Sequence, residues 1–360
     1  MGYPLVEIDL AKVRRNVEEV VARCRAHGVS VAGVVKGYSG LPELSRMLEE
    51  GGCAQLASAR LSQLAAARRA GLRGPFMLIR IPMPAELAQV VALCQYSLHS
   101  ERAVLDVLEA ECARQGRDHS VIIMAELGDL REGVWGREAL EGLCLHVERE
   151  LPHLRLAGVG ANLGCYGSIR CTTEKMEELV SLAEGVERAL GRPLELISGG
   201  ATNAYVLMER GGLPARINHL RIGGGMVLGR DMAENYGDPF DYIAKDAFTL
   251  KTQVVEVGRK PSHPVGEIFR DSFGEGTRYE DRGERLRALA AAGKVDYYSP
   301  AKIIPRLPGV QVLGASSDHT ILDVEDCPVP VRAGDILEFD LRYPAMAFLT
   351  AGRDVEIRYV

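Results

Sequence analysis

The 360-residue chain has no long apolar segment and no large excess of charge of one sign. No apolar run approaches the roughly 18 to 20 residues that a membrane-spanning helix needs. The N-terminus, MGYPLVEIDLAKVRRN, lacks the apolar core of a signal peptide, and its sixth residue is Val6, where a myristoylation signal has Ser or Thr. The net charge of −6 gives no reason to expect a nucleic acid or a membrane as partner. We therefore expect a cytoplasmic protein that binds neither.

The eight cysteines form no Cys-x-x-Cys pair. Scattered thiols are typical of reduced cytosolic proteins, in which they pack as small apolar residues. Their spacing predicts no structural zinc site. Hydrophobic residues make up 47% of the chain and charged residues 26%, and we find no internal repeat or low-complexity tract. This composition indicates an ordinary folded protein, long enough for a large domain and a smaller one.

Short apolar runs alternate with amphipathic stretches from residue 30 to about residue 224. Several of the amphipathic stretches end in Gly, which is typical of helix C-termini. An open, doubly wound sheet would alternate in the same way, but eight repeats favour a (β/α)8 barrel of the TIM type. The strand-like runs are VSVAGVV (29–35), AQLA (54–57), PFMLI (75–79), QYSL (95–98), SVIIMAEL (120–127), LRLAGVG (154–160), LELIS (194–198) and NHLRIG (218–223).

After residue 240 the pattern changes to strands separated by Pro- and Gly-rich breaks, which predicts a mostly β second domain. The opening strand YPLVEIDL (3–10) could pair into this domain. We expect a barrel domain at residues 10–235 and a β-rich domain formed by residues 1–9 and 236–360. The strand-like runs of the second domain are KTQVVEVGRK (251–260), VQVLGAS (310–316), TILDV (320–324), DILEFDLRY (335–343) and VEIRYV (355–360).

Lys36 is the first residue that suggests chemistry. In VAGVVKGYSG (31–40) it follows a buried β-branched strand and precedes a flexible turn. In a barrel this strand end lies on the catalytic face. Apolar walls lower the pKa of a lysine, and the neutral amine is the form that makes a Schiff base or removes a proton. The alternative is a lysine whose charged end merely reaches solvent.

Two glycine-rich turns follow the last two predicted barrel strands. The first is ISGGATNA (197–204), which contains Thr202, and the second is NHLRIGGGMVLG (218–229), in which Arg221 precedes three glycines. Successive glycine N–H groups can approach a phosphate closely, and barrel phosphate sites often follow strands seven and eight. A single glycine triplet is usually only a turn, but two glycine-rich turns on adjacent strands favour a phosphate site.

The order of these motifs resembles the alanine racemase family, the fold type III pyridoxal-phosphate (PLP) enzymes, and most closely its ornithine racemase subgroup. VVKGYSG (34–40) is similar to the family's lysine strand and LGDLREGV (127–134) to its arginine segment after strand five. GVGANLGCYG (158–167) and the two glycine-rich turns take the family's places after strands six to eight. GASSDHTILDV (314–324) resembles the segment that meets the substrate carboxylate. The resemblance implies a PLP-dependent amino-acid racemase that works as a homodimer with shared sites.

The resemblance also implies a role for each matching residue. Lys36 would hold PLP as an aldimine and move one proton, and Arg221 would face the pyridine nitrogen and keep it unprotonated. Arg131 would contact the phenolate oxygen of PLP or the substrate carboxylate, and Asn162 would lie near the ring. Ser317 and Asp318 would reach the substrate carboxylate from the partner subunit. The phosphate would be held by Thr202, Gly223, Gly224 and Tyr343. Tyr38 could join them, although it stands closer to the lysine than in alanine racemases.

The chain departs from the family at the catalytic tyrosine that the partner subunit supplies. The matching stretch, KPSHPVGEIFRDSFG (260–274), has no tyrosine. Racemisation needs an acid or base on each face of the α-carbon, so another group must replace it. His263 is our candidate, with Cys165 and Asp271 as weaker ones. Met124 stands where many alanine racemases have a modified lysine that supports the arginine.

The resemblance also bears on the substrate. The subgroup resemblance implies ornithine, with lysine or another basic amino acid as close possibilities, and an alanine or broad-specificity racemase as an alternative. Glu267 or Asp271 could pair with a distal ammonium group. Equally, these acids and the charged run YEDRGERLRALAAAG (279–293) could form a solvated helix and its cap.

Three other functions are compatible with parts of the sequence. A metal-assisted PLP lyase, such as a D-threonine aldolase or D-serine dehydratase, would need a site such as His319, Asp323 and Cys327. The simpler interpretation makes these a turn residue and a strand end, and we predict no metal. A non-catalytic PLP carrier would not need the second domain. A barrel enzyme of unrelated chemistry would show no absorbance band that depends on Lys36.

Overall fold

The computed structural model describes residues 2–238, 240–270, 273–274 and 279–360. The chain divides into two compact units, one of Val13–Ile243 and the other of residues 1–12 together with Ala244–Val360. The sequence-based boundaries fall nearby, at 9/10 and 235/236. In the structure the segment from 236 to 243 is part of the first unit.

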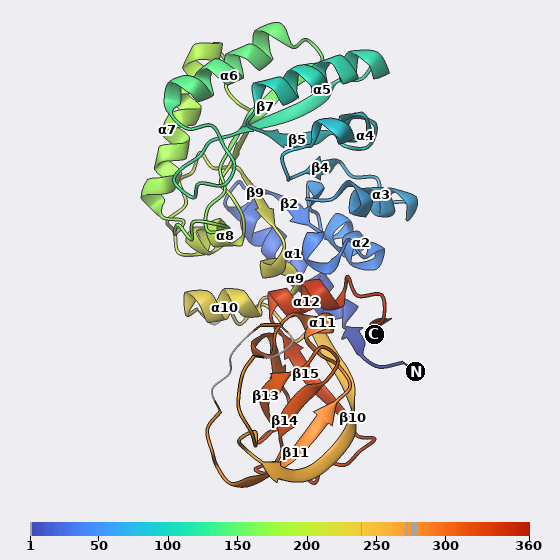
Figure 1. Cartoon of the computed structure of the whole chain (residues 1–360). Helices are drawn as coiled ribbons and strands as arrows, with labels where there is room; N and C mark the ends of the chain where they lie inside the picture. Colours follow the sequence, from blue (N-terminus) through green and yellow to red (C-terminus); the bar gives the residue numbers. More distant parts are fainter. Residues whose placement is uncertain (1, 239, 271–272, 275–278) are drawn as a thin grey trace. The chain divides into compact units, whose positions relative to one another are not determined.

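The first unit is built on a closed barrel of eight parallel strands, β2 to β9 (Figure 1). Each strand overlaps one of the eight predicted runs, so the predicted (β/α)8 barrel is confirmed. The strands are β2 (Ser30–Val34), β3 (Gln55–Ser58), β4 (Phe76–Leu78), β5 (Tyr96–His99), β6 (His119–Met124), β7 (Leu154–Gly160), β8 (Leu196–Ser198) and β9 (His219–Ile222).

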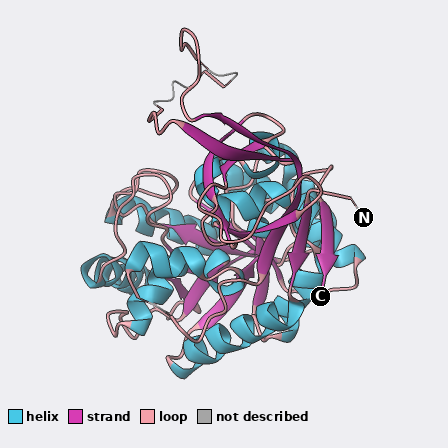
Figure 2. Ribbon diagram, turned by 90° about the horizontal axis from the view of Figure 1, so that it is seen from below, coloured by secondary structure: helices cyan, strands magenta, loops and turns pink. Residues whose placement is uncertain are grey.

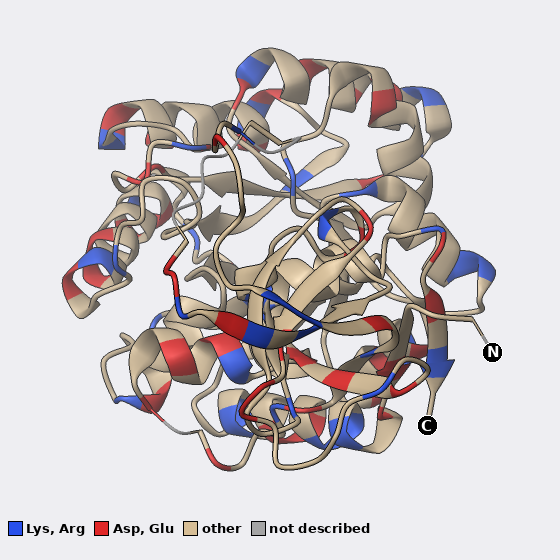
Figure 3. Cartoon of the chain, turned by 60° about the horizontal axis from the view of Figure 1, so that its bottom comes forward, with Lys and Arg blue, Asp and Glu red and all other residues tan. Residues whose placement is uncertain are grey.

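Helices surround the strands in Figure 2, and Lys and Arg alternate with Asp and Glu along the outer helices drawn in Figure 3. Glycines in the left-handed conformation end three of them, with Gly116 after α5, Gly191 after α7 and Gly237 after α10. None of the helices in the described part of the chain combines the length and the apolar character needed to cross a bilayer. The helices are α1 (Leu10–Ala26), α2 (Pro42–Glu50), α3 (Leu61–Arg69), α4 (Leu87–Leu93), α5 (Arg102–Gln115), α6 (Arg137–Glu150), α7 (Thr173–Leu190), α8 (Thr202–Glu209), α9 (Gly224–Val227) and α10 (Arg230–Tyr236), with 3-10 turns η1 (Lys36–Tyr38) and η2 (Pro84–Glu86).

Alternate residues of the barrel strands fill its interior, as the two-residue period of a strand requires. Inward-facing side chains from seven strands form one buried apolar cluster, which includes Ala57, Leu98, Met124 and Leu196. Met124 is therefore a core residue of the barrel. The cluster also defines the two faces of each strand, because a residue next to a cluster member in sequence faces the helices instead.

The second unit contains an antiparallel sheet in the order β12-β15-β10-β11-β14-β13, joined through β10 by β1. The opening strand β1 pairs antiparallel with β10 and parallel with β16, which confirms the expected pairing of the N-terminal strand into this domain. The elements are β1 (Leu5–Ile8), β10 (Phe248–Pro261), β11 (Glu284–Ala290), β12 (Ile303–Pro305), β13 (Gln311–Ala315), β14 (Thr320–Asp323), β15 (Ile336–Leu341), β16 (Glu356–Tyr359), α11 (Lys294–Tyr297), α12 (Tyr343–Leu349) and the 3-10 turn η3 (Pro300–Lys302).

The prediction of a helix in the charged run 279–293 is wrong, because residues Glu284–Ala290 form strand β11. Its Glu, Arg, Leu and Ala residues favour a helix on intrinsic propensity. However, β11 pairs with β10 on one side and with β14 on the other. Tertiary pairing on two sides overrides a preference of a few tenths of a kcal/mol per residue.

Candidate active site

Lys36 stands directly behind the end of the first barrel strand. β2 ends at Val34, and the turn η1 begins at Lys36. Because all eight strands are parallel, their carboxyl ends open on one side of the barrel, which we call the barrel mouth. The chain places the predicted cofactor residues of the first unit at this end, namely Lys36, Arg131 after β6, Asn162 after β7, Thr202 at the start of α8, and Arg221, Gly223 and Gly224 at the end of β9.

The surroundings of Lys36 favour its neutral form. Its side chain reaches solvent, but the atoms of the barrel mouth surround it, and this partial burial lowers its pKa. The guanidinium groups of Arg131 and Arg221 lower the pKa further, whereas Cys165 and Glu132 act in the opposite direction. The net shift is downward, so more of the lysine is neutral near pH 7 than in a free peptide.

Arg221 lies inside the barrel, almost completely buried. Its Nη2 donates a 2.7 Å hydrogen bond to the Ala161 carbonyl, next to Asn162, and its Nη1 donates to Ser198 Oγ. Burial lowers the pKa of Arg221 to about 10, so the side chain remains charged at neutral pH. This arrangement places a fixed positive charge under the barrel mouth.

The two glycine-rich turns pack against each other. A Cβ added to Gly225 would lie 2.4 Å from Thr202 Cγ2, and one added to Gly223 would lie 3.1 Å from the Val34 carbonyl oxygen. Only glycine therefore lets the turn after β9 approach both Thr202 and the end of β2. The first N–H groups of α8 and α9 lack partners within their helices, so this cradle presents donors to an anion.

Asn162 and Arg131 come from the loops after β7 and β6. The side-chain nitrogen of Asn162 is buried and has no hydrogen-bond partner among the described residues. The Arg131 guanidinium is bound through Nε and Nη2 to the carboxylate of Glu132. The unbonded side-chain nitrogen of Asn162 can donate a hydrogen bond to a ligand. Arg131 has further N–H groups that can donate as well.

Asp129 ties these two loops together. Its buried carboxylate accepts hydrogen bonds from the backbone N–H groups of Gly164, Cys165, Tyr166 and Ile169 at 2.9 to 3.2 Å. Burial alone would raise the pKa of this carboxyl, but the four donors lower it overall. Asp129 therefore stays ionised and holds the loop that carries Cys165.

Tyr38 is fully buried, and its surroundings differ from those of the phosphate cradle. Its hydroxyl lies beside Ser45 and Cys53, and burial raises its pKa. Ser45 belongs to α2, so the ring lies toward the helix layer. A phosphate contact by Tyr38 remains a prediction.

The other predicted residues belong to the second unit. His263 follows β10, where its Nδ1 lies 2.7 Å from the Pro264 carbonyl oxygen and its ring meets Tyr279 edge-on. Ser317 and Asp318 bond to each other in the turn between β13 and β14, and a Cβ on Gly293 would lie 2.1 Å from the Ser317 carbonyl oxygen. Tyr343 begins α12. The roles of all four stay predictions, as does that of the exposed Glu267, and Asp271 lies outside the described residues.

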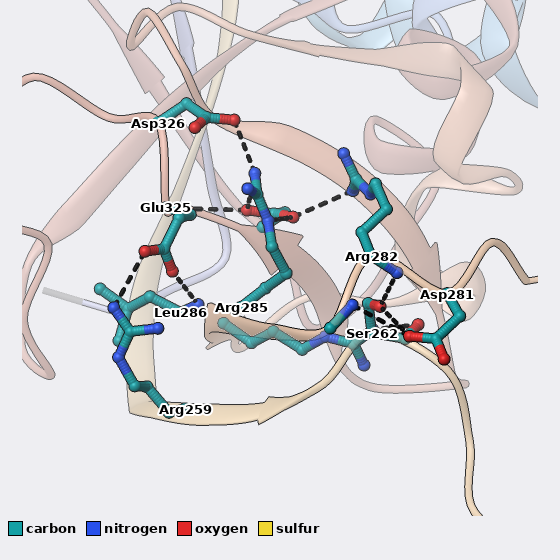
Figure 4. Close-up of polar contacts among 11 residues, drawn as sticks. Arg259, Ser262, Asp281, Arg282, Arg285, Leu286, Glu325 and Asp326 are labelled. Atoms are coloured by element: carbon teal, nitrogen blue, oxygen red, sulfur yellow. Dashed lines mark hydrogen bonds and ion pairs between the residues drawn. The ribbon is translucent and has the colours of Figure 1, made fainter.

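The base of the segment that carries His263 is held by arginines (Figure 4). The buried carboxylate of Asp323 accepts from Arg282 and Arg285, and Arg285 also reaches Asp326. Asp323 is thus committed to ion pairs and is not available for a metal with His319 and Cys327. Within residues 2–238, 240–270, 273–274 and 279–360, no three His, Cys, Asp or Glu side chains are grouped to hold a metal ion.

Comparison with known proteins identifies the family. The model of the alanine racemase N-terminal domain matches residues 8–231. A lysine racemase of Thermotoga maritima is 37% identical over 346 residues, which cover 96% of this chain and 95% of the relative. An ornithine racemase of Acetoanaerobium sticklandii is 35% identical over 344 residues, 96% of each chain. The chain belongs to the alanine racemase family.

A solved alanine racemase from Streptomyces lavendulae has the same fold, with a TM-score of 0.74 at 19% identity, covering 100% of this chain and 97% of that one. The predicted family, the likeness to ornithine racemases and the enzyme class, an amino-acid racemase, are confirmed. Sequence reasoning missed Ser198, His219, Glu132 and Asp129. His219 carried a signal, because it stands two residues before Arg221 and therefore on the same strand face.

Proposed function

We propose that this member of the family is a PLP-dependent racemase of a basic amino acid, ornithine or lysine. One observation carries the proposal: relatives named for these two substrates match 96% of the chain. The positions of Lys36 and Arg221 at the barrel mouth support it. We also expect it to act in the cytoplasm, where thiols stay reduced; none of its eight cysteines is paired in the structure.

The residues at the barrel mouth suit PLP on three counts. The cradle of Thr202, Gly223 and Gly224 is narrow enough to exclude a Cβ at Gly225 and offers N–H donors to a phosphate. The buried, unpaired amide of Asn162 can donate to an oxygen of the ring. The pKa of Lys36 is lowered, as a covalent attachment to a carbonyl requires.

When bound, PLP supplies an electron sink for the carbanion formed at the α-carbon. The chain's own residues supply the rest. Lys36 would remove the α-proton on one face in one direction of the reaction and deliver it there in the other direction, and its lowered pKa increases the neutral fraction that can remove the proton. Arg221 would donate to the pyridine nitrogen, and because a guanidinium has no proton to give up near pH 7, that nitrogen would stay unprotonated. Arg131 would hold the substrate carboxylate or the phenolate oxygen of the cofactor.

A second copy of the chain would complete the site. We propose a homodimer in which the second unit of one copy supplies His263 as acid or base on the opposite face, Ser317 and Asp318 at the substrate, and Tyr343 at the phosphate. Mixing Lys36→Ala with His263→Ala subunits tests this sharing, because a hybrid dimer has one intact site. Recovery of partial activity supports it, and two inactive variants that stay inactive on mixing contradict it.

The function is tested with L- and D-amino acids in D2O in the presence of PLP. We expect ornithine or lysine to exchange the α-proton and lose optical activity, as followed by proton NMR and circular dichroism. Exchange confined to alanine would refute the basic substrate but spare the racemase. Cleavage products that disappear with a chelator would instead indicate a lyase.

A further inference from the structure

Four buried polar side chains form a continuous hydrogen-bond chain inside the barrel, which we call the Arg221 chain. Arg221 Nη1 donates to Ser198 Oγ, Ser198 Oγ lies 2.7 Å from His219 Nδ1, and His219 Nε2 lies 3.3 Å from Gln55 Oε1. None of the four residues exposes more than 7% of its surface. Each faces inward, because Ala57 and Leu196, two residues from Gln55 and Ser198, belong to the barrel core.

The chemistry of these groups fixes the direction of the first link in the chain. A guanidinium can only donate, so Ser198 Oγ accepts from Arg221. The hydroxyl proton of Ser198 then goes to His219 Nδ1, which accepts only in a neutral imidazole that carries its proton on Nε2. That N–H donates to Gln55 Oε1. With Oε1 of Gln55 facing His219, this neutral form satisfies every link and directs the hydroxyl proton of Ser198 away from the guanidinium.

The electrostatic surroundings favour the same state. Burial and the neighbouring Arg221 cation lower the pKa of His219 to about 3, so the imidazole is neutral at neutral pH. The single positive charge of the chain therefore stays on Arg221. Two of the five guanidinium N–H groups are held, one by Ser198 and one by the Ala161 carbonyl, and the others can serve a ligand.

We propose that Ser198, His219 and Gln55 are positioning residues that hold the Arg221 guanidinium in one orientation toward the ring nitrogen of the cofactor. The inference rests on the proposed function, since it concerns the same site. It adds the residues that orient the Arg221 guanidinium, for which the sequence predicted none. A bond to a charged donor in a buried site is worth roughly ten- to a hundred-fold in binding.

A matched control exists in the same barrel. Ser97 Oγ lies 2.7 Å from both His99 Nε2 and His119 Nε2, and all three residues are buried. We call them the Ser97 group. Leu98 belongs to the barrel core, so Ser97 and His99 face the helix layer instead. Both serine hydroxyls contact an imidazole, but no arginine in the described part of the chain bonds to the Ser97 group.

The test compares Ser198→Ala with Ser97→Ala, and adds Ser198→Thr to restore the hydroxyl. PLP affinity is measured by equilibrium dialysis, the visible absorbance of the PLP-bound protein is recorded against pH, and urea unfolding of the cofactor-free protein reports stability. We expect Ser198→Ala to weaken PLP binding about ten- to a hundred-fold and to shift the pH dependence of the visible band. Ser97→Ala should change PLP affinity less than two-fold, although both alanine variants lower the urea midpoint, and Ser198→Thr should recover most of the affinity.

Nitrogen-15 NMR of the cofactor-free protein gives a readout that does not depend on PLP, and His219 should appear neutral with its proton on Nε2. A wild-type protein that binds no PLP would overturn the proposed function and this inference with it. A wild type that binds PLP, with Ser198→Ala equal to Ser97→Ala in affinity and spectrum, would overturn only the positioning role. A His219 that is doubly protonated at neutral pH would overturn it as well, because the chain would then carry a second buried cation beside Arg221.

Discussion

The Arg221 chain and the Ser97 group are two buried serine–histidine arrangements in one barrel, with the same 2.7 Å contacts between hydroxyl and imidazole. They differ in the group to which the serine and histidine are joined. The Arg221 chain begins at a guanidinium under the barrel mouth, whereas the Ser97 group joins β5 and β6 on the helix side. Residue types and hydrogen-bond lengths alone therefore do not distinguish function from structure; the charged group at the carboxyl end of the strands does.

Both arrangements keep their histidines neutral, and for the same reason. Burial lowers the pKa of His99 and of His219 to about 3, and that of His119 to about 4. A neutral imidazole in a low-dielectric interior needs no counter-ion. The charge of Arg221 is the exception inside the barrel, which is why it is a candidate for function.

The largest effect should follow from Lys36→Ala at the barrel mouth. Loss of the amine that moves the proton should reduce racemisation by at least ~100-fold, the lower end of general acid–base effects. The visible absorbance of the PLP-bound protein should disappear with it. Ser97→Ala, measured beside it, should retain activity, and equal losses in both variants would point to a folding defect instead.

Arg221→Met should convert the Arg221 chain into an arrangement like the Ser97 group. We expect activity to fall about 10- to 100-fold, the worth of a hydrogen bond to a charged group. The pKa of His219 should rise toward its ordinary value, because the neighbouring cation that helps to lower it is gone. An NMR titration in which His219 is unmoved would mean that the two side chains are not coupled.

Two glycine-to-alanine variants compare the barrel mouth with a helix far from it in sequence, as Ser198→Ala and Ser97→Ala compare the two serines. Gly225→Ala places a Cβ 2.4 Å from Thr202 Cγ2 and should weaken PLP binding by about 1 to 3 kcal/mol through overpacking. Gly142→Ala in α6 meets nothing within 4 Å and should raise helix stability by ~0.5 to 1 kcal/mol. PLP titration and thermal unfolding of both variants check this, and an unchanged PLP affinity in Gly225→Ala would exclude the cradle.

The smallest effect concerns acid stability. The unfolded chain binds protons at its histidines below pH ~6.5, whereas folded His99 does not until about pH 3. Stability is therefore present above pH ~6.5 and lost as the pH falls, by about 1.4 kcal/mol per pH unit for each such histidine. His99→Gln should reduce the slope between pH 6.5 and 5 by that amount in urea unfolding, and an unaltered slope would show that His99 is not held neutral.

The sequence allowed the barrel to be predicted, and with it the positions of Lys36 and Arg221 near the carboxyl ends of two strands. Each barrel strand is a short apolar run, and the parallel arrangement sends every strand end to one side. The positions of Lys36 and Arg221 follow from that rule alone. The strand β11 could not be predicted, because its residues favour a helix and only pairing with β10 and β14 makes them a strand.

The hydrogen bonds around Arg221 could not be predicted, because the residues that make them come from different segments of the sequence. Gln55, Ser198 and His219 belong to three strands, and their contact depends on the register after the barrel closes; Ser198 aligns with His219 between β8 and β9. Asp129 is similar, since its four donors lie 35 to 40 residues away. Such contacts can be predicted only when the fold and the strand register are known.

The most direct test of the central claim is to find where PLP is attached. The PLP-loaded protein is reduced with borohydride, digested and analysed by mass spectrometry. We expect a pyridoxyl group on the peptide that contains Lys36, and none in Lys36→Ala. A label on another lysine, or no label in a protein that racemises ornithine or lysine, would contradict it.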